Sequence, residues 1–354
     1  MKLLFLTQTL DRRDAVLGFV SRWVEGLARH CEAVRVIALE VGDTSHLPRN
    51  VDWREVGREG RVKRYFRYRR FLKDALQREG FDTVLSHMVP RYALVSDGLA
   101  RRAGAGRYLW YTHAGVDARL RKAVPRVQKV FTASEESLRI ESPNKVVTGH
   151  GIDLEHFSEI ISPPAEPPRL LSVGRLTPRK DPMTILHALH QLVGEGRDVH
   201  LDLVGGGLTG SDIGYREEVL AAIDSLDLSA RVALHGSVPY LDIPEHYRRS
   251  TLVVNASLTG SLDKVSLEAM ASRRPVISCN DSAPALFAEL GEEAETLYFP
   301  PGNQAVLAAC LRHWLDAGAQ ARLELGARLV EIVRRDHDVD VLMARLVALM
   351  GGEG

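Results

Sequence analysis

Two cations follow a short apolar run in the segment RLLSVGRLTPRKDP, residues 169–182. Gly174 ends the run, and Arg175 and Lys180 stand between it and the next predicted helix. Glycine lets a backbone approach a ligand closely, and an arginine fork beside a lysine point charge suits a diphosphate. A Gly-Arg turn alone is more often only a turn, so this interpretation needs a second phosphate-compatible element.

The segment GSLDKVSLEAMASRRPVIS, residues 260–278, supplies that element. A loop there leads into a short helix, whose first amides and positive dipole end favour a phosphate. The structural alternative for Asp263 is that it caps this helix. Glu268 comes four residues after Lys264. It is either half of a weak ion pair on one helix face or a carboxylate that accepts hydrogen bonds from two ribose hydroxyls.

Three histidines, His87, His113 and His150, each follow a predicted strand. Three imidazoles suggest a metal site, but no carboxylate stands at ligand spacing beside any of them. Each one taken alone is therefore interpreted as a structural histidine, and no metal site is predicted.

Strands must position these residues at their ends. Apolar or β-branched runs alternate with amphipathic stretches such as residues 181–196 along the whole chain. This alternation predicts an α/β fold class, with two doubly wound Rossmann-like domains that face each other across a cleft. Ligands are expected in that cleft, beyond the carboxyl ends of the strands. The predicted strands are 2–8, 33–40, 82–88, 107–113, 129–134, 145–151, 169–175, 199–207, 230–238, 250–257 and 274–279.

A proline-rich segment, SEIISPPAEPPR at residues 158–169, continues neither a helix nor a sheet and is interpreted as a linker. The predicted domains are residues 1–160, on the acceptor side, and 161–335, which binds the nucleotide sugar. A C-terminal helix at 336–354 is expected to pack back on the first domain. The run DHDVD at 336–340 alternates acids as a calcium loop does, but it lacks the glycine and later glutamate. It is predicted to start the last helix.

The 354-residue chain, 45% hydrophobic and 26% charged, has an ordinary globular composition. It contains no apolar run of about 18 residues, and polar residues follow the N-terminus too early for a signal peptide. A cytoplasmic location is therefore expected, with the inner face of the membrane as a peripheral alternative. Cys31, Cys279 and Cys310 have neither disulfide nor zinc-ligand spacing and are interpreted as core thiols.

The net charge of zero hides an asymmetry between the two halves. Residues 1–160 hold 28 Lys and Arg against 20 Asp and Glu, so this half carries +8 and the remainder −8. A basic half suggests an anionic partner, such as a phosphate-bearing substrate or a membrane surface. The alternative is attraction between the halves themselves.

A run of cations and aromatic residues at 58–73 leaves a similar choice open. It either lies as a basic helix on an anionic membrane or packs an apolar stripe into the core, with its cations in solvent. The stripe would consist of Val62, Tyr65, Tyr68, Leu72 and Leu76.

Several motifs in the second half carry a family resemblance: VGRLTPRKDP, LVGGG, VALHGSVP and SLEAMASRRPVIS. Together they resemble the nucleotide-binding half of the retaining glycosyltransferases of family 4, which have the GT-B fold. The first half resembles the acceptor-side domain of a bacterial branch of that family, through TQTLDRRDAVLGFVSRWVEGLA, LSHMVPRY, WYTHAGV, FTASEES and GHGID. The resemblance covers essentially the whole chain.

This resemblance implies a donor site for a nucleotide-diphosphate sugar. Arg175 and Lys180 would hold the diphosphate, and Glu268 would hold the ribose. His113 would face the donor sugar and hydrogen-bond it, or stabilise charge on the leaving phosphate. The catalytic residues implied are His113, Arg175, Lys180 and Asp263. The donor-binding residues implied are Gly18, Gly174, Arg175, Lys180, Gly236, Val238, Ser261, Leu262, Asp263, Lys264, Val265 and Glu268.

One position departs from the family pattern of Glu, seven residues, then Glu. Counting back from Glu268 reaches Gly260, so the first glutamate, which in the family touches the transferred sugar, is absent. Our hypothesis is that Asp263 and Lys264 take over part of that contact.

The implied activity is transfer of a hexose from a UDP or GDP sugar to a hydroxyl of a glycan or lipid-linked acceptor, with retention at the anomeric carbon. Neither a metal nor a cofactor is implied, and a nucleic-acid partner is not indicated. The expected setting is bacterial envelope or exopolysaccharide synthesis. Two alternatives stay open. One is a sugar-nucleotide epimerase or phosphorylase on the same fold, and the other is a non-catalytic nucleotide-binding protein.

Overall fold

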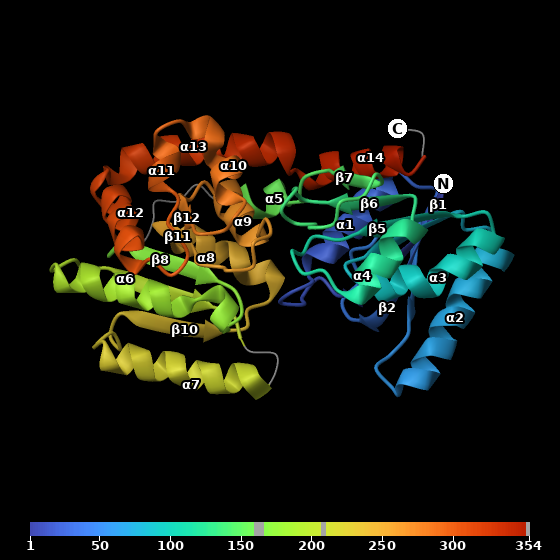
Figure 1. Cartoon of the computed structure of the whole chain (residues 1–354), viewed down its shortest axis with the longest axis horizontal. Coiled ribbons are helices and arrows are strands. Elements are labelled where there is room, and N and C mark those ends of the chain that lie inside the picture. The colour runs from blue at the N-terminus through green and yellow to red at the C-terminus, as the bar shows by residue number, and fades with distance from the viewer. Residues whose placement is uncertain (159–165, 207–209, 352–354) are drawn as a thin grey trace. The chain divides into compact units, whose positions relative to one another are not determined.

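The computed structural model describes residues 1–158, 166–206 and 210–351 (Figure 1). They form two compact units, each with its own parallel sheet and helices. The predicted α/β class is therefore confirmed. The segment predicted to be a linker, 158–169, falls largely on residues 159–165, which lie outside the described residues.

Unit 1 comprises Met1–Asp153, Pro239–Leu241 and Asp336–Gly354. Its strands are β1 (Lys2–Leu10), β2 (Ala33–Val41), β3 (Val51–Glu55), β4 (Thr83–His87), β5 (Gly106–Trp110), β6 (Lys129–Thr132) and β7 (Lys145–Val147). They form one parallel sheet in the order β3-β2-β1-β4-β5-β6-β7. The order changes direction at β1, as in doubly wound folds. Leu3 to Leu6 of β1 are fully buried, because both faces of such a sheet are covered.

Helical segments among the described residues of unit 1 cover this sheet or border it. They are α1 (Phe19–Arg29), α2 (Arg61–Arg78), α3 (Pro90–Arg102), α4 (Ala118–Ala123), η1 (Val124–Arg126) and α14 (Val339–Leu349).

Unit 2 comprises Leu154–Val238 and Asp242–Arg335. Its strands are β8 (Arg169–Val173), β9 (His200–Val204), β10 (Val232–Gly236), β11 (Leu252–Asn255) and β12 (Val276–Ser278), in the order β10-β9-β8-β11-β12. All neighbours pair in parallel, so their carboxyl ends meet at one edge of the sheet.

The helices of unit 2 connect and cover these strands. They are α5 (Leu154–Ser158), η2 (Pro178–Lys180), α6 (Pro182–Gly194), α7 (Gly210–Ser225), α8 (Ile243–Arg249), α9 (Lys264–Ala271), α10 (Ala283–Phe287), η4 (Ala288–Leu290), α11 (Glu293–Thr296), α12 (Gln304–Asp316) and α13 (Gly318–Asp336). A further turn, η3 (Tyr240–Asp242), starts in the short segment that belongs to unit 1.

The last helix, α14, packs on α1 within unit 1. Asp338 caps α14 by accepting hydrogen bonds from the amides of Asp340 and Val341. Asp340 in turn pairs with Arg22 at 2.7 Å and with Arg29 at 2.8 Å. Within the run DHDVD, Asp336 ends α13 and Asp338 caps the last helix, so the prediction that the run starts that helix is confirmed for its second part.

Every predicted strand range overlaps an observed strand, and among the described residues β3 is the strand that the pattern missed. Its sequence, VDWRE, is mostly polar, and its last three residues are exposed at the edge of the sheet. A half-exposed edge strand lacks the apolar run by which a buried parallel strand is recognised.

The core stripe predicted for α2 is only partly correct. Tyr68, Leu72 and Leu76 are buried, but 69% of Val62 and 43% of Tyr65 are exposed. The reason is that the core cluster beneath α2 begins at Tyr68, so the first two turns have no apolar surface to cover.

The three cysteines are buried free thiols, as expected. Within the described ranges, no helix is long and apolar enough to cross a bilayer.

Candidate functional site

The ends of β8, β9 and β10 approach one another backbone to backbone. The amide of Gly174 donates to the carbonyl of Val204, and the amide of Gly205 donates to that of Gly236, each at 2.8 Å. Gly174 and Gly205 have φ angles of 150° and 138°. A Cβ at Gly205 would lie 2.0 Å from the carbonyl oxygen of Gly174. Only glycine allows this approach.

Arg175 and Lys180 lie on the loop that leaves β8. The side chain of Lys180 lies against Gly174. A Cβ added to Gly174 would lie 3.3 Å from both Cδ and Cε of Lys180. Arg175 is exposed, and among the described residues its guanidinium has no hydrogen-bond or ion-pair partner. Arg179 on the same loop is also exposed, and its guanidinium likewise has no partner among the described residues. The loop therefore presents two cations that no carboxylate of the described chain neutralises.

Asp263 occupies the N-cap position of α9, but its side chain does not cap the helix. Its Oδ2 pairs instead with Nζ of Lys180, across two loops that follow different strands. The capping role considered for Asp263 is therefore wrong, because a cation within reach competes for the carboxylate. This ion pair brings the two predicted phosphate-binding elements together.

The residues on either side of Asp263, in the loop and in the first turn of α9, include buried ones. Ser261, Leu262 and Val265 are buried, with exposed fractions of 6–8%. This loop is joined to the loop after β8, since the amide of Leu258 donates to the carbonyl of Arg179 at 2.8 Å. Asn255 supports the helix start by donating to Oγ of Ser266 at 2.9 Å.

Glu268 is a buried carboxylate, only 7% exposed. Its Oε2 accepts a hydrogen bond from Oη of Tyr247 on α8 at 3.0 Å. Within the described residues, Oε1 accepts no hydrogen bond. Burial raises the pKa of the Glu268 carboxyl, while the charge of Lys264 and the Tyr247 hydrogen bond act in the opposite direction.

Gly260, where the family pattern has glutamate, has a φ of 67°. Residues other than glycine rarely adopt this left-handed conformation. A glutamate at this position would be strained in the observed loop. The backbone conformation therefore accounts for glycine in place of the family's glutamate.

Gly236 is the last residue of β10, at the edge of the same sheet, and Val238 lies two residues after it. Gly236 is exposed with a φ of 68°, and Val238 is half-buried. His235 fixes the end of β10, since its Nε2 lies 2.8 Å from Oδ1 of Asp202 on β9. Asp202 also pairs with Arg169 at 3.2 Å.

His113 and Gly18 belong to unit 1. Nδ1 of His113 accepts a hydrogen bond from the amide of Gly115 at 2.8 Å, which leaves the proton of a neutral ring on Nε2. Gly18 precedes α1, and a Cβ there would lie 2.6 Å from the carbonyl oxygen of Asp14. The close packing of the loop before α1 therefore explains why residue 18 is glycine.

The other two histidines lie in the core of unit 1. His87 packs beside Phe5 and Trp23 and contacts Oγ1 of Thr7 at 3.2 Å, and His150 is 4% exposed. The burial of His87 and His150 agrees with their interpretation as structural histidines. Among the described residues, no group of three or more His, Cys, Asp or Glu side chains is arranged to hold a metal ion.

Sequence reasoning missed Tyr247, which anchors Glu268 from 21 positions upstream. Tyr247 lies in IPEHYRR, a short helix with no motif of its own. The available signal was that a buried carboxylate on α9 needs a hydrogen-bond donor, but the pattern does not say which residue supplies it.

A family model described as "Glycosyl transferases group 1" matches residues 154–334, about half of the chain. The D-inositol 3-phosphate glycosyltransferase of Kineococcus radiotolerans is 30% identical over 205 residues, which cover 52% of this chain and 46% of that protein. The lipopolysaccharide core biosynthesis mannosyltransferase LpcC of Rhizobium leguminosarum bv. viciae is 29% identical over 189 residues, 51% and 53% of the two chains. The chain thus spans about half the length of these curated relatives.

Two solved structures resemble the chain over almost its whole length. HepE from Anabaena, in complex with UDP and glucose, has a TM-score of 0.78 and 18% identity, covering 99% of both chains. Sucrose-phosphate synthase from Thermosynechococcus elongatus has a TM-score of 0.77 and 18% identity, covering 99% of this chain and 98% of its own. At these identities the likeness concerns the fold, and it confirms the expected GT-B fold.

Proposed function

Because the chain belongs to the glycosyl transferases group 1 family, we propose that it moves a hexose from a UDP or GDP sugar to a hydroxyl of a glycan or lipid-linked acceptor. The complex of HepE with UDP and glucose supports a nucleotide-sugar donor. The activities for which the two relatives are named support a phosphorylated or envelope-glycan acceptor. The proposed setting is bacterial envelope or exopolysaccharide synthesis.

The observation that carries the proposal is the cationic loop after β8. Arg175 is exposed without an ion-pair partner among the described residues, and Lys180 lies close to the start of α9. In the reaction, negative charge develops on the departing diphosphate, and preorganised donors stabilise it. Two cations and a helix terminus supply that positive charge in place of a divalent ion.

Glu268 is proposed to bind the donor ribose. Tyr247 holds one carboxylate oxygen at 3.0 Å, which orients the other oxygen and leaves it able to accept a hydroxyl hydrogen. The glycine-lined ends of β8 and β9 let a nucleotide approach the backbone. Gly236 and Val238 are proposed to contact the base, and Gly18 the diphosphate.

Asp263, Lys264 and His113 are proposed to contact the transferred sugar. Because Gly260 has a φ of 67°, the usual glutamate of the family would be strained at this position. Asp263 is already oriented by Lys180, so its carboxylate is positioned rather than free to rotate. We propose displacement with retention and without a protein nucleophile, as the family resemblance implies.

A peripheral membrane contact through residues 58–73 is part of the proposal. Val62 is 69% exposed and Phe66 is 66% exposed on α2, among several cations. Exposed apolar side chains between cations suit an anionic bilayer surface. Co-sedimentation with anionic vesicles, and its loss in a Val62→Ser, Phe66→Ser variant, tests this contact.

A screen of UDP and GDP sugars against a crude lipid-linked acceptor fraction tests the activity. The expected result is one donor consumed only when acceptor is present, with NMR of the product showing the donor's anomeric configuration. Donor epimerised without acceptor, or sugar phosphate formed from inorganic phosphate, would assign the chain to the alternative enzymes on this fold.

A non-catalytic nucleotide-binding role is the second candidate. The observations that favour it are glycine at position 260 and the neutralisation of Lys180 by Asp263. Binding of a nucleotide diphosphate without turnover of any sugar in the screen would support this role instead.

A further inference from the structure

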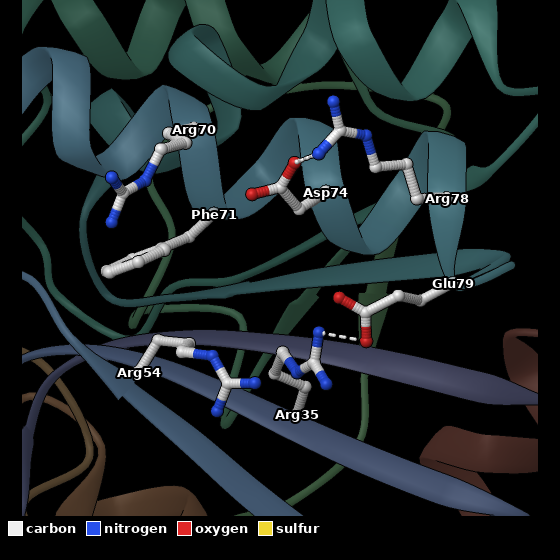
Figure 2. Close-up of a pocket in the computed structure, with 7 residues that line it drawn as sticks. All are labelled: Arg35, Arg54, Arg70, Phe71, Asp74, Arg78 and Glu79. Atoms are coloured by element: carbon white, nitrogen blue, oxygen red, sulfur yellow. Dashed lines mark ion pairs between the residues drawn. The ribbon is translucent and has the colours of Figure 1, made fainter.

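A pocket of about 510 Å³ opens between α2 and the sheet of unit 1 (Figure 2). Its strand residues are Arg35, near the start of β2, and Arg54, near the end of β3. In the parallel pairing of these strands, Arg35 lies in register with Asp52, and Ile37 with Arg54. The lining residues are Arg35, Arg54, Arg70, Phe71, Asp74, Arg78 and Glu79.

Four guanidinium groups and two carboxylates line this pocket, which gives the lining a net charge of +2. Two of the four guanidinium groups already form close ion pairs with carboxylates. Arg35 is buried, holds both oxygens of Asp52 at 2.7 and 2.5 Å, and reaches Glu79 at 2.6 Å. Arg78 pairs with Asp74 at 3.0 Å.

The other two cations, Arg54 and Arg70, are not neutralised in this way. Arg54 donates to the carbonyl of Trp53 at 2.8 Å and reaches Asp52 only at 3.8 Å. Arg70 lies over the ring of Phe71 at 5.3 Å, and in the described part of the chain it has no carboxylate partner. Figure 2 shows Arg54 on the strand side of the pocket, and Arg70 with Phe71 on the helix side.

We propose that this pocket binds a phosphate ester. Arg54 and Arg70 supply forked donors that suit a phosphate, and Phe71 supplies an apolar wall for the carbon skeleton. The volume is that of a small-molecule site. This inference goes beyond the proposed function, because none of these residues belongs to the donor-binding set.

The phosphate ester can come from the headgroup of an anionic lipid or from a soluble metabolite. Phe66 and Val62 lie one and two turns before Arg70 on the same face of α2, and both are exposed. An apolar strip that leads to the pocket suits a lipid, whose acyl chains would lie near it.

Calorimetric titration with sn-glycerol 3-phosphate tests the pocket. The pocket variant is Arg54→Gln, Arg70→Gln, and the matched control is Lys63→Gln, Lys73→Gln, which removes the same charge from exposed positions of α2 outside the lining. We expect binding to weaken about tenfold or more in the pocket variant and to change less than about twofold in the control. Arg175→Gln separates this site from the proposed donor site and is expected to leave the binding unchanged.

Sedimentation with phosphatidylglycerol and phosphatidylcholine vesicles distinguishes the two sources. Weaker binding of the pocket variant to phosphatidylglycerol vesicles, beyond that of the control, supports a lipid headgroup. Loss of glycerol phosphate binding with unchanged vesicle binding supports a soluble phosphate ester. The proposal is overturned by equal losses in both variants, by loss on Arg175→Gln alone, or by no binding of either probe to the wild-type chain.

Discussion

The hydroxyl of Tyr247 donates a hydrogen bond to Oε2 of Glu268 over 3.0 Å, between two buried side chains on different helices. Tyr247→Phe removes this donor and leaves a buried carboxylate oxygen unpaired. We expect a loss of about 1 kcal/mol of stability and severalfold weaker UDP binding, because Glu268 is no longer oriented. Thermal unfolding and calorimetry measure the two effects. A Tyr298→Phe control, at a half-buried tyrosine in the same unit, is expected to change neither.

Donor binding should depend on pH through Glu268. Burial raises its pKa, and a ribose hydroxyl donates a stronger hydrogen bond to the ionised carboxylate than to the neutral carboxyl. UDP affinity is therefore expected to be full above the raised pKa and to fall as the pH is lowered through it. Glu268→Gln is expected to bind UDP about tenfold more weakly and without this pH dependence. A pH profile of Glu268→Gln that parallels the wild-type profile would contradict the assignment.

The same raised pKa has a consequence for stability. The native state binds this proton more tightly than the unfolded chain, so the carboxylate destabilises the fold above the raised pKa, and this cost fades as the pH falls. Glu268→Gln should therefore have a higher Tm than the wild-type chain above that pKa, with a smaller gap in acid. Scanning calorimetry across pH measures the gap.

Asp263 and Lys180 are expected to separate binding from turnover. Asp263→Asn removes the charge that neutralises Lys180, so UDP affinity should stay equal or rise. Turnover of the donor sugar should fall about tenfold or more, since the proposed sugar contact is weakened. Lys264→Ala should lower turnover in the same way. Near-normal kinetics in both variants would remove these residues from the sugar site.

Gly205 is expected to tolerate no side chain. A Cβ would lie 2.0 Å from the carbonyl oxygen of Gly174, at a φ of 138°. Gly205→Ala should lower the stability by about 2 kcal/mol or more. Gly194→Ala in α6 is the matched control, because nothing lies within 4 Å of its Cβ position. Equal Tm values for the two variants would show that the strand ends are not closely packed.

The fold was largely predictable from the sequence, whereas the side-chain contacts within the candidate site were not. Buried parallel strands such as β1 have unbroken apolar runs, and the edge strand β3 has none. The cationic and glutamate segments were recognised by residue type and spacing. The pair Lys180–Asp263 was not, because it joins loops 83 positions apart in sequence. Helix propensity favours Asp263 as a cap, and only the folded chain brings a competing lysine to it.

The core stripe of α2 is a case in which the sequence predicted the helix but not how much of it is buried. The periodicity of Val62, Tyr65 and Tyr68 is helical, and the residues do form a helix. Periodicity does not tell how far the neighbouring core extends, and here that core stops at Tyr68. The uncovered turns are the reason that a surface role for α2 is worth testing.

The central claim is that the loop after β8 binds a nucleotide diphosphate. Calorimetric titration of UDP and GDP into the wild-type chain, Arg175→Ala and Arg179→Ala tests it most directly, because both arginines are exposed on the same loop. We predict one bound nucleotide per chain, binding about tenfold weaker or worse in Arg175→Ala, and a change of less than about twofold in Arg179→Ala. Equal losses in the two variants, or no binding of either nucleotide, would contradict the claim.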